Sequence, residues 1–287
     1  MLLDLNKIFN FPPNFLEASG DGHLTKLNIS SFDRKISNKP SLVVTIGDSW
    51  TFGGSLWYLF PYSASGEEIN KFRLDNIFGS YLSQDLDADW INISLPFMSN
   101  FWIAKQLENL NSVLDQLDYD KIYIVVTLTE VGRELMDIGL FNYHVGTTYK
   151  SIQDLIDTIS KQVEDRILSC KLDSRCKLVV GRTYIDDSYP NLKPVMLADS
   201  WLELVVGNPV NSKCFFIGHR VVDTVKQSVD NGLAEILDVF PNIEKRIDML
   251  SQSKYNIQKE HYRHPNPEGH RIWATYILNK LNETKDN

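Results

Sequence analysis

The chain has 287 residues, 43% of them hydrophobic and 23% charged, a composition typical of a globular protein with one large α/β core. Its net charge of −8 and its lack of a dense Lys/Arg run argue against nucleic acid as a partner, because phosphate binding needs a basic face. No apolar stretch reaches the roughly 20 residues that span a bilayer. The N-terminus also lacks the basic start and the cleavage site of a secretory signal, so we expect a cytoplasmic protein without a membrane span.

The three cysteines do not form the pattern of a disulfide framework or a metal site. Cys170, Cys176 and Cys214 are irregularly spaced, and an odd count leaves at least one thiol unpaired. We therefore expect reduced structural cysteines, no metal site and no cofactor.

Residues 1–40 are predicted to be an extension that wraps a single domain formed by residues 41–287. The extension mixes apolar anchors with turn-forming Pro12–Pro13 and Gly20–Gly22, so we expect little regular structure in it. A partner-binding arm is the alternative interpretation.

The first predicted strand, Leu42–Ile46, is apolar and uncharged, as expected for a strand buried on both faces of a parallel sheet. It breaks at Gly47 and delivers Asp48 and Ser49 into a turn. Ligands of open α/β sheets bind outside the carboxyl ends of the strands, so Ser49 is the first candidate nucleophile. The alternative is an ordinary turn, which Gly, Asp and Ser all favour.

Helical and strand-like segments alternate along the rest of the chain. The predicted helices cover residues 67–86, 100–117, 148–169 and 243–250, and a last helix begins with Asn266 as N-cap and Pro267 at the first helical position. The further predicted strands are 90–94, 121–128, 177–184 and 214–217, with an excursion over the sheet at 185–212. The expected fold is α/β, a three-layer α/β/α sandwich around about five parallel strands.

Four segments, in chain order, resemble the motif blocks of the SGNH, or GDSL-type, hydrolase family. They are Gly47–Ser49, Asn92–Asn100, Thr129–Glu134 and His264–His270. The resemblance covers roughly residues 41–281 and implies a flavodoxin-like SGNH-hydrolase fold. Because an early Ser and a late His are catalytic partners in that family, it also implies Ser49 as nucleophile and His264 as general base.

The second and third blocks imply the groups that stabilise the oxyanion or orient the substrate. The candidates are the backbone N–H near Phe97, and Asn100, Thr129 and Arg133. An ion pair of Arg133 with Glu134 is the alternative interpretation for that side chain.

The chain departs from the family pattern at three supporting positions. Phe97 stands where the family has a Gly, no Asn donor occurs between Ile122 and Arg133, and His261 replaces the Asp three residues before the catalytic His. The group that orients His264 is then Glu260, His261 or a backbone carbonyl, or a Ser–His dyad remains.

The predicted function is that of a serine-dependent esterase that removes a small acyl group from a carbohydrate or a similar ester. The aromatic-rich loop at residues 55–66 favours an acylated glycan, because flat rings stack on sugar faces. The alternative is a protein that has kept the fold and lost the chemistry. Its variant blocks are similar to those of phage and marine-bacterial proteins, so that alternative includes a glycan-binding or virion-associated role.

Overall fold

The structure is a computed structural model that describes residues 33–54, 56, 64–96, 98–129, 152–183, 189–207, 215–217 and 263–283. For residues 152–156, 205–207, 215–217 and 263–264 it describes the backbone.

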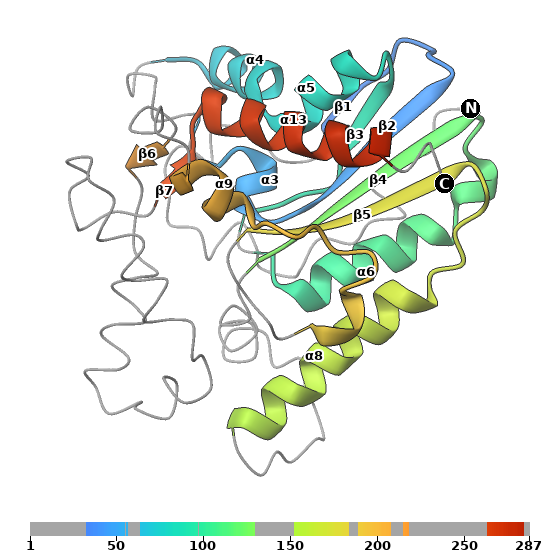
Figure 1. Cartoon of the computed structure of the whole chain (residues 1–287). Coiled ribbons are helices and arrows are strands. Elements are labelled where there is room, and N and C mark those ends of the chain that lie inside the picture. The colour runs from blue at the N-terminus through green and yellow to red at the C-terminus, as the bar shows by residue number, and fades with distance from the viewer. Residues whose placement is uncertain are drawn as a thin grey trace.

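A five-stranded sheet forms the centre of the described structure (Figure 1). In spatial order its strands are β1 (Asp33–Lys35), β3 (Asp89–Asn92), β2 (Ser41–Gly47), β4 (Lys121–Leu128) and β5 (Cys176–Arg182). β3, β2, β4 and β5 run parallel, and β1 lies antiparallel along the edge beside β3. The carboxyl ends of the four parallel strands therefore meet at one edge of the sheet.

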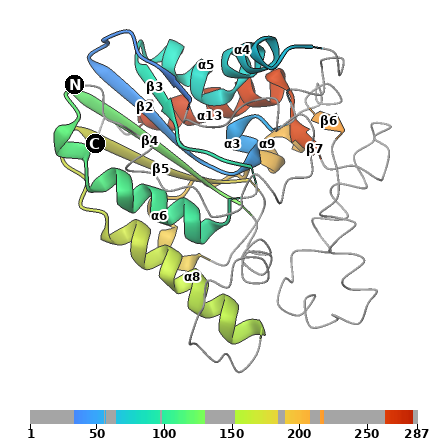
Figure 2. The same ribbon diagram turned by 180° about the vertical axis from the view of Figure 1, so that it is seen from behind.

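Helices cover both faces of this sheet, as Figures 1 and 2 show from opposite sides. One face is covered by α6 (Asn100–Asn111) and α8 (Ile152–Ser169), and the other by α4 (Gly66–Asn76), α5 (Phe78–Asp85), α9 (Trp201–Gly207) and α13 (Pro267–Glu283). Alternate side chains of β2 serve the two layers, since Val44 packs with the α6 and α8 cluster and Val43 with the α5 and α13 cluster. The predicted three-layer α/β/α sandwich is confirmed.

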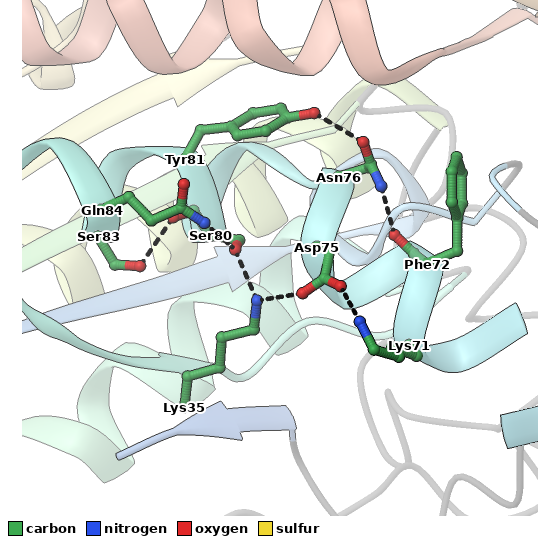
Figure 3. Close-up of polar contacts among 9 residues, drawn as sticks. All are labelled: Lys35, Lys71, Phe72, Asp75, Asn76, Ser80, Tyr81, Ser83 and Gln84. Carbon is green, nitrogen blue, oxygen red and sulfur yellow. Dashed lines mark hydrogen bonds and ion pairs between the residues drawn. The ribbon is translucent and has the colours of Figure 1, made fainter. Parts of the chain in front are cut away.

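β1 lies in the segment for which the sequence predicted little regular structure. Lys35 of β1 donates hydrogen bonds to Asp75 of α4 at 2.7 Å and to Ser80 of α5 at 3.0 Å, and Lys71 also pairs with Asp75 (Figure 3). These contacts give a short polar strand partners in the helical layer. Residues 1–32 lie outside the described residues, so their assignment as an extension stays a prediction.

Two predicted helices are shorter than their apolar spacing indicated. The segment 67–86 is divided into α4 and α5 at Ile77, whose ψ of 154° is extended and whose side chain is buried. The helix predicted for 100–117 ends at Asn111 and is followed by a 3₁₀ turn, Leu114–Gln116. The break at Ile77 has a structural use, because the Phe78 N–H at the start of α5 donates to the His270 Nδ1 atom of α13 at 3.3 Å.

The excursion after β5 contains more structure than predicted. It includes a 3₁₀ turn, Pro190–Leu192, and the helix α9. The prediction that 214–217 is a strand of the central sheet is wrong, because β6 (Phe215–Ile217) pairs antiparallel with β7 (Arg263–Pro265) in a separate two-stranded sheet. The helix predicted for 243–250 lies outside the described residues.

The start of the last helix is confirmed. Gly269 N–H donates to the Asn266 side-chain oxygen at 3.1 Å, and His270 N–H donates to the Asn266 carbonyl at 3.0 Å.

Within the described residues, no helix has both the length and the apolar composition that crossing a membrane requires.

Candidate active site

The turn after β2 carries Ser49 at the carboxyl edge of the sheet. Ser49 is the first residue of a four-residue helix, α3 (Ser49–Phe52), and is 6% exposed. A Cβ atom at Gly47 would lie 2.7 Å from the Thr51 Cβ and 3.1 Å from the Thr127 carbonyl oxygen. Only glycine therefore lets α3 fold back this closely onto the ends of β2 and β4.

The Asp48 carboxylate fixes this turn from the inside. One of its oxygens accepts from the Trp50 N–H at 3.0 Å as the N-cap of α3, and the other accepts from the Thr129 hydroxyl at 2.8 Å. Asp48 is fully buried and Thr129 nearly so. A buried carboxyl group requires such donors, so the end of β4 and the turn after β2 are held together by a buried hydrogen bond.

Asn100 extends the network to the start of α6. Its side-chain oxygen accepts from the Thr129 N–H at 2.7 Å, and its amide group donates to the Thr129 carbonyl at 2.9 Å and to the Tyr189 hydroxyl at 2.7 Å. Both amide protons of Asn100 are thus engaged inside the protein, and the single hydroxyl proton of Thr129 is engaged by Asp48. In this arrangement the two residues support the turn that carries Ser49.

The C-terminal end of α3 is held separately. Gly53 ends the helix in the left-handed region at φ 77°, and the N–H of Gly54 donates to the Ser49 carbonyl at 2.7 Å. The buried Arg73 of α4 donates to the Phe52 carbonyl at 2.8 Å. Both ends of a helix too short to be stable alone are therefore anchored to neighbouring elements.

His264 lies on β7, and β7 lies against α3 with Cα atoms within 8 Å. Figures 1 and 2 show α3, α9 and β7 together at the same end of the sheet. The structure therefore brings the strand that contains His264 to the helix that begins with Ser49. The side chain of His264 lies outside the described part of the structure.

The other predicted site residues fall into two groups. Thr129 and Asn100 lie at the same edge as Ser49, as described above. Phe97, Arg133, Glu260 and His261 lie outside the described residues. In the part of the chain that the structure describes, no cluster of three or more His, Cys, Asp or Glu side chains is arranged to hold a metal ion.

The sequence did not identify Tyr189 as part of the site, nor Asp48 as the buried side chain that supports the turn with Ser49. The Gly–Asp–Ser triplet was a signal for Asp48, since Asp before a helix start is a common N-cap. For Tyr189 there was no local signal, because its partner Asn100 lies 89 residues earlier in the chain.

Comparison with known proteins gave distant likenesses. No protein-family model and no curated protein matches the sequence. Among solved structures, a protein assigned to the G-D-S-L family of lipolytic proteins from Desulfitobacterium hafniense DCB-2 is 13% identical, with a TM-score of 0.33 over 83% of this chain and 98% of that chain. The salicylyl-acyltransferase SsfX3 from a tetracycline biosynthetic pathway is 14% identical, with a TM-score of 0.33 over 87% of this chain and 57% of that one. A protein assigned as a GDSL-like lipase from Parabacteroides merdae ATCC 43184 is 11% identical, with a TM-score of 0.28 over 86% of this chain and 98% of that one.

Proposed function

We propose that this chain is a serine-dependent ester hydrolase of the SGNH type, with Ser49 as nucleophile and His264 as general base. The observation that carries the proposal is the contact of α3 with β7, which joins segments from opposite ends of the sequence. The position of Ser49, at the carboxyl edge of a parallel sheet, is where open α/β sheets bind ligands.

The proposed reaction has two steps that share one base. Ser49 Oγ attacks the ester carbonyl carbon while His264 accepts the hydroxyl proton, and the resulting tetrahedral oxyanion collapses to an acyl-serine. The alcohol leaves with the proton from His264. Water then attacks the acyl-serine, His264 again accepts a proton and returns it to Ser49, and the carboxylic acid is released.

Backbone groups are the proposed oxyanion donors. They are the N–H of Ser49 and the N–H near Phe97, a position where a side chain is chemically tolerated because the donor belongs to the main chain. Arg133 is a further candidate donor, and Glu260 or His261 is the proposed orienting group for His264.

The proposed substrate is a small acyl group on a carbohydrate or a similar ester. It rests on the aromatic residues Trp57, Tyr58, Phe60 and Tyr62, which follow the nucleophile turn in sequence. Rings of this kind stack on sugar faces.

A second candidate function is supported by the hydrogen bonds of the site. The side-chain donors of Thr129 and Asn100 are used inside the protein, so these two residues do not supply the extra oxyanion donor that the commoner third block contains. A loss of one donor costs roughly 10² to 10³ in turnover. A protein with this site and no compensating donor would serve as a binding or structural protein, including one in a virion.

A fluorophosphonate probe separates the two functions, because it phosphonylates a serine only where a base activates that serine. We expect the wild-type protein to be labelled on the peptide that contains Ser49, and Ser49→Ala to lose both the label and the hydrolysis of p-nitrophenyl acetate. Ser83→Ala is the matched control, since Ser83 is 5% exposed on α5 and should leave both signals unchanged. Equal labelling or hydrolysis by Ser49→Ala and the wild type would refute the proposed hydrolase.

A further inference from the structure

Trp201, the first residue of α9, contacts the nucleophile turn. Its side chain is fully buried, and its ring lies edge-on to the ring of Trp50, with centroids 5.4 Å apart and an interplanar angle of 78°. Trp50 directly follows Ser49 in α3. Edge-to-face pairs of this kind contribute about 0.5–1.5 kcal/mol beyond their buried area and fix the relative orientation of the two rings.

The same tryptophan holds the start of α13. Its Nε1–H donates to the Gly269 carbonyl at 3.0 Å, and its ring contacts His270 edge-on at 5.1 Å and stacks on Trp273 at 5.3 Å with an angle of 5°. Gly269 lies in the first turn of α13, which begins one residue after the strand that contains His264. Trp201 therefore touches both the helix that begins with the candidate nucleophile and the first turn of the helix that follows the candidate base.

The helix that carries Trp201 is itself fixed to the sheet. Ser200 and Glu203 form a reciprocal cap, in which the Ser200 N–H donates to Glu203 at 2.8 Å and the Glu203 N–H donates to Ser200 at 3.2 Å. The Leu202 N–H donates to the carbonyl of Thr183, which follows β5, at 3.0 Å. Trp201 is thus a rigid bridge, because its backbone is tied to the sheet and its ring is enclosed by neighbours.

We propose that Trp201 is a positioning residue for the ester hydrolysis, one that sets the distance between Ser49 and His264. This inference rests on the proposed function. A serine and its base must lie within about 2.6–3.2 Å, and a misplacement of about 1 Å costs on the order of 10²-fold in rate. Because α3 and β7 come from opposite ends of the chain, a side chain packed against α3 and against the first turn of α13, the helix that follows β7, affects how closely they approach.

The test compares Trp201→Phe with a matched variant elsewhere in the core. Trp201→Phe keeps a buried ring and removes the Nε1–H donor to Gly269. Trp90→Phe is the control, since Trp90 is equally buried and its Nε1–H donates to the Thr45 hydroxyl at 3.2 Å within the sheet. Both variants lose a similar ring volume and one hydrogen bond, so their thermal stabilities should fall by similar amounts.

We expect Trp201→Phe to lower kcat on p-nitrophenyl acetate, and the rate of fluorophosphonate labelling, by about 10- to 100-fold, with KM changed less than about 3-fold. Trp90→Phe should keep kcat within about 3-fold of the wild type. A loss of kcat in Trp201→Phe no greater than in Trp90→Phe would overturn the positioning role while leaving the hydrolase proposal standing. Absence of labelling in the wild type would instead overturn both.

A variant on the other side of the contact covers the case in which Trp201→Phe does not fold. Trp50→Phe shortens the ring that Trp201 meets edge-on and leaves the hydrogen bond to Gly269 in place. We expect it to lower kcat by more than 3-fold at unchanged KM, and a kcat equal to that of the wild type would contradict the bridge.

Discussion

Replacing Arg73 by Met tests how the nucleophile helix is held at its C-terminal end. Arg73 of α4 is 2% exposed, and its guanidinium donates to the two carboxylate oxygens of Asp33 at 2.8 and 2.6 Å. It also donates to the Phe52 carbonyl and to the Asn70 side chain, and lies 3.9 Å from the centroid of the Phe52 ring. One side chain thus connects α3 to the edge strand β1.

The expected loss of stability follows from the charge that the substitution leaves behind. The side chain of Asp33 is itself only 10% exposed, and among the described residues the Asn92 amide also donates to it, at 3.2 Å. Removal of one partner from a buried ion pair costs about 3–5 kcal/mol, because the other charge stays buried without compensation. We therefore expect Arg73→Met to lower the free energy of unfolding by that amount. Arg73→Lys should cost less but not be neutral, because an ammonium group cannot reproduce the planar fork.

Urea denaturation of Arg73→Met, Asp33→Asn and the double variant measures the coupling between the two groups. We expect the loss of unfolding free energy in the double variant to be smaller than the sum of the losses in the two single variants, by about 1–3 kcal/mol. Lys280→Met is the control, since the side chains of its ion pair with Glu283 are 36% and 61% exposed, and an exposed pair of this kind contributes little to stability. Additive effects, or a cost for Arg73→Met no greater than that for Lys280→Met, would refute the reasoning.

Two further predictions concern the turn and the pH dependence of stability. Gly47→Ala places a methyl group against Thr51 and should cost about 1–3 kcal/mol by overpacking, with slower fluorophosphonate labelling, as measured by thermal denaturation and labelling kinetics. For Asp75, burial alone would raise the pKa, but hydrogen bonds from Lys35 and Lys71 outweigh it and lower the pKa below the ordinary value of 3.8. A lowered folded-state pKa stabilises the protein above pH 3.8, and that contribution is lost as the pH falls through the folded pKa. The side chain is 42% exposed, so Asp75→Asn should remove less than about 1 kcal/mol at pH 7 and less still at pH 3, as followed by urea denaturation at both pH values.

The central strands could be predicted from sequence because strands buried on both faces consist of apolar residues. The strand predicted for residues 121–128 is β4 with the same bounds, and the strand at 42–46 is extended by one residue at each end in β2. Both are uninterrupted apolar runs, which a strand buried on two faces requires. The start of α13 was equally readable, since Asn266 and Pro267 are local signals of a helix N-terminus.

Elements whose stability comes from distant partners could not be predicted in this way. β1 is the polar tripeptide Asp33–Lys35, which has no apolar alternation, and its ion pairs come from Arg73 and Asp75 forty residues later. The division of α4 from α5 at Ile77 is likewise set by tertiary packing, because the apolar spacing across it fits a continuous helix.

The same distinction between local signals and distant contacts applies to the residues of the candidate site. Short motifs identify the groups that would react, since the Gly–Asp–Ser turn and the His–Pro–Asn segment each have a local conformation. The groups that hold them in place are recognised only through contacts between distant segments, such as Asn100 with Tyr189 and Trp201 with Gly269, which are 89 and 68 residues apart. The positioning role proposed for Trp201 predicts that a protein that kept both motifs but lost Trp201 would bind its substrate and turn it over slowly. The motifs alone therefore do not decide between the hydrolase and the binding protein. Labelling of Ser49 decides that choice, and kcat and KM measured separately for the Trp201 variant then test how the site is positioned.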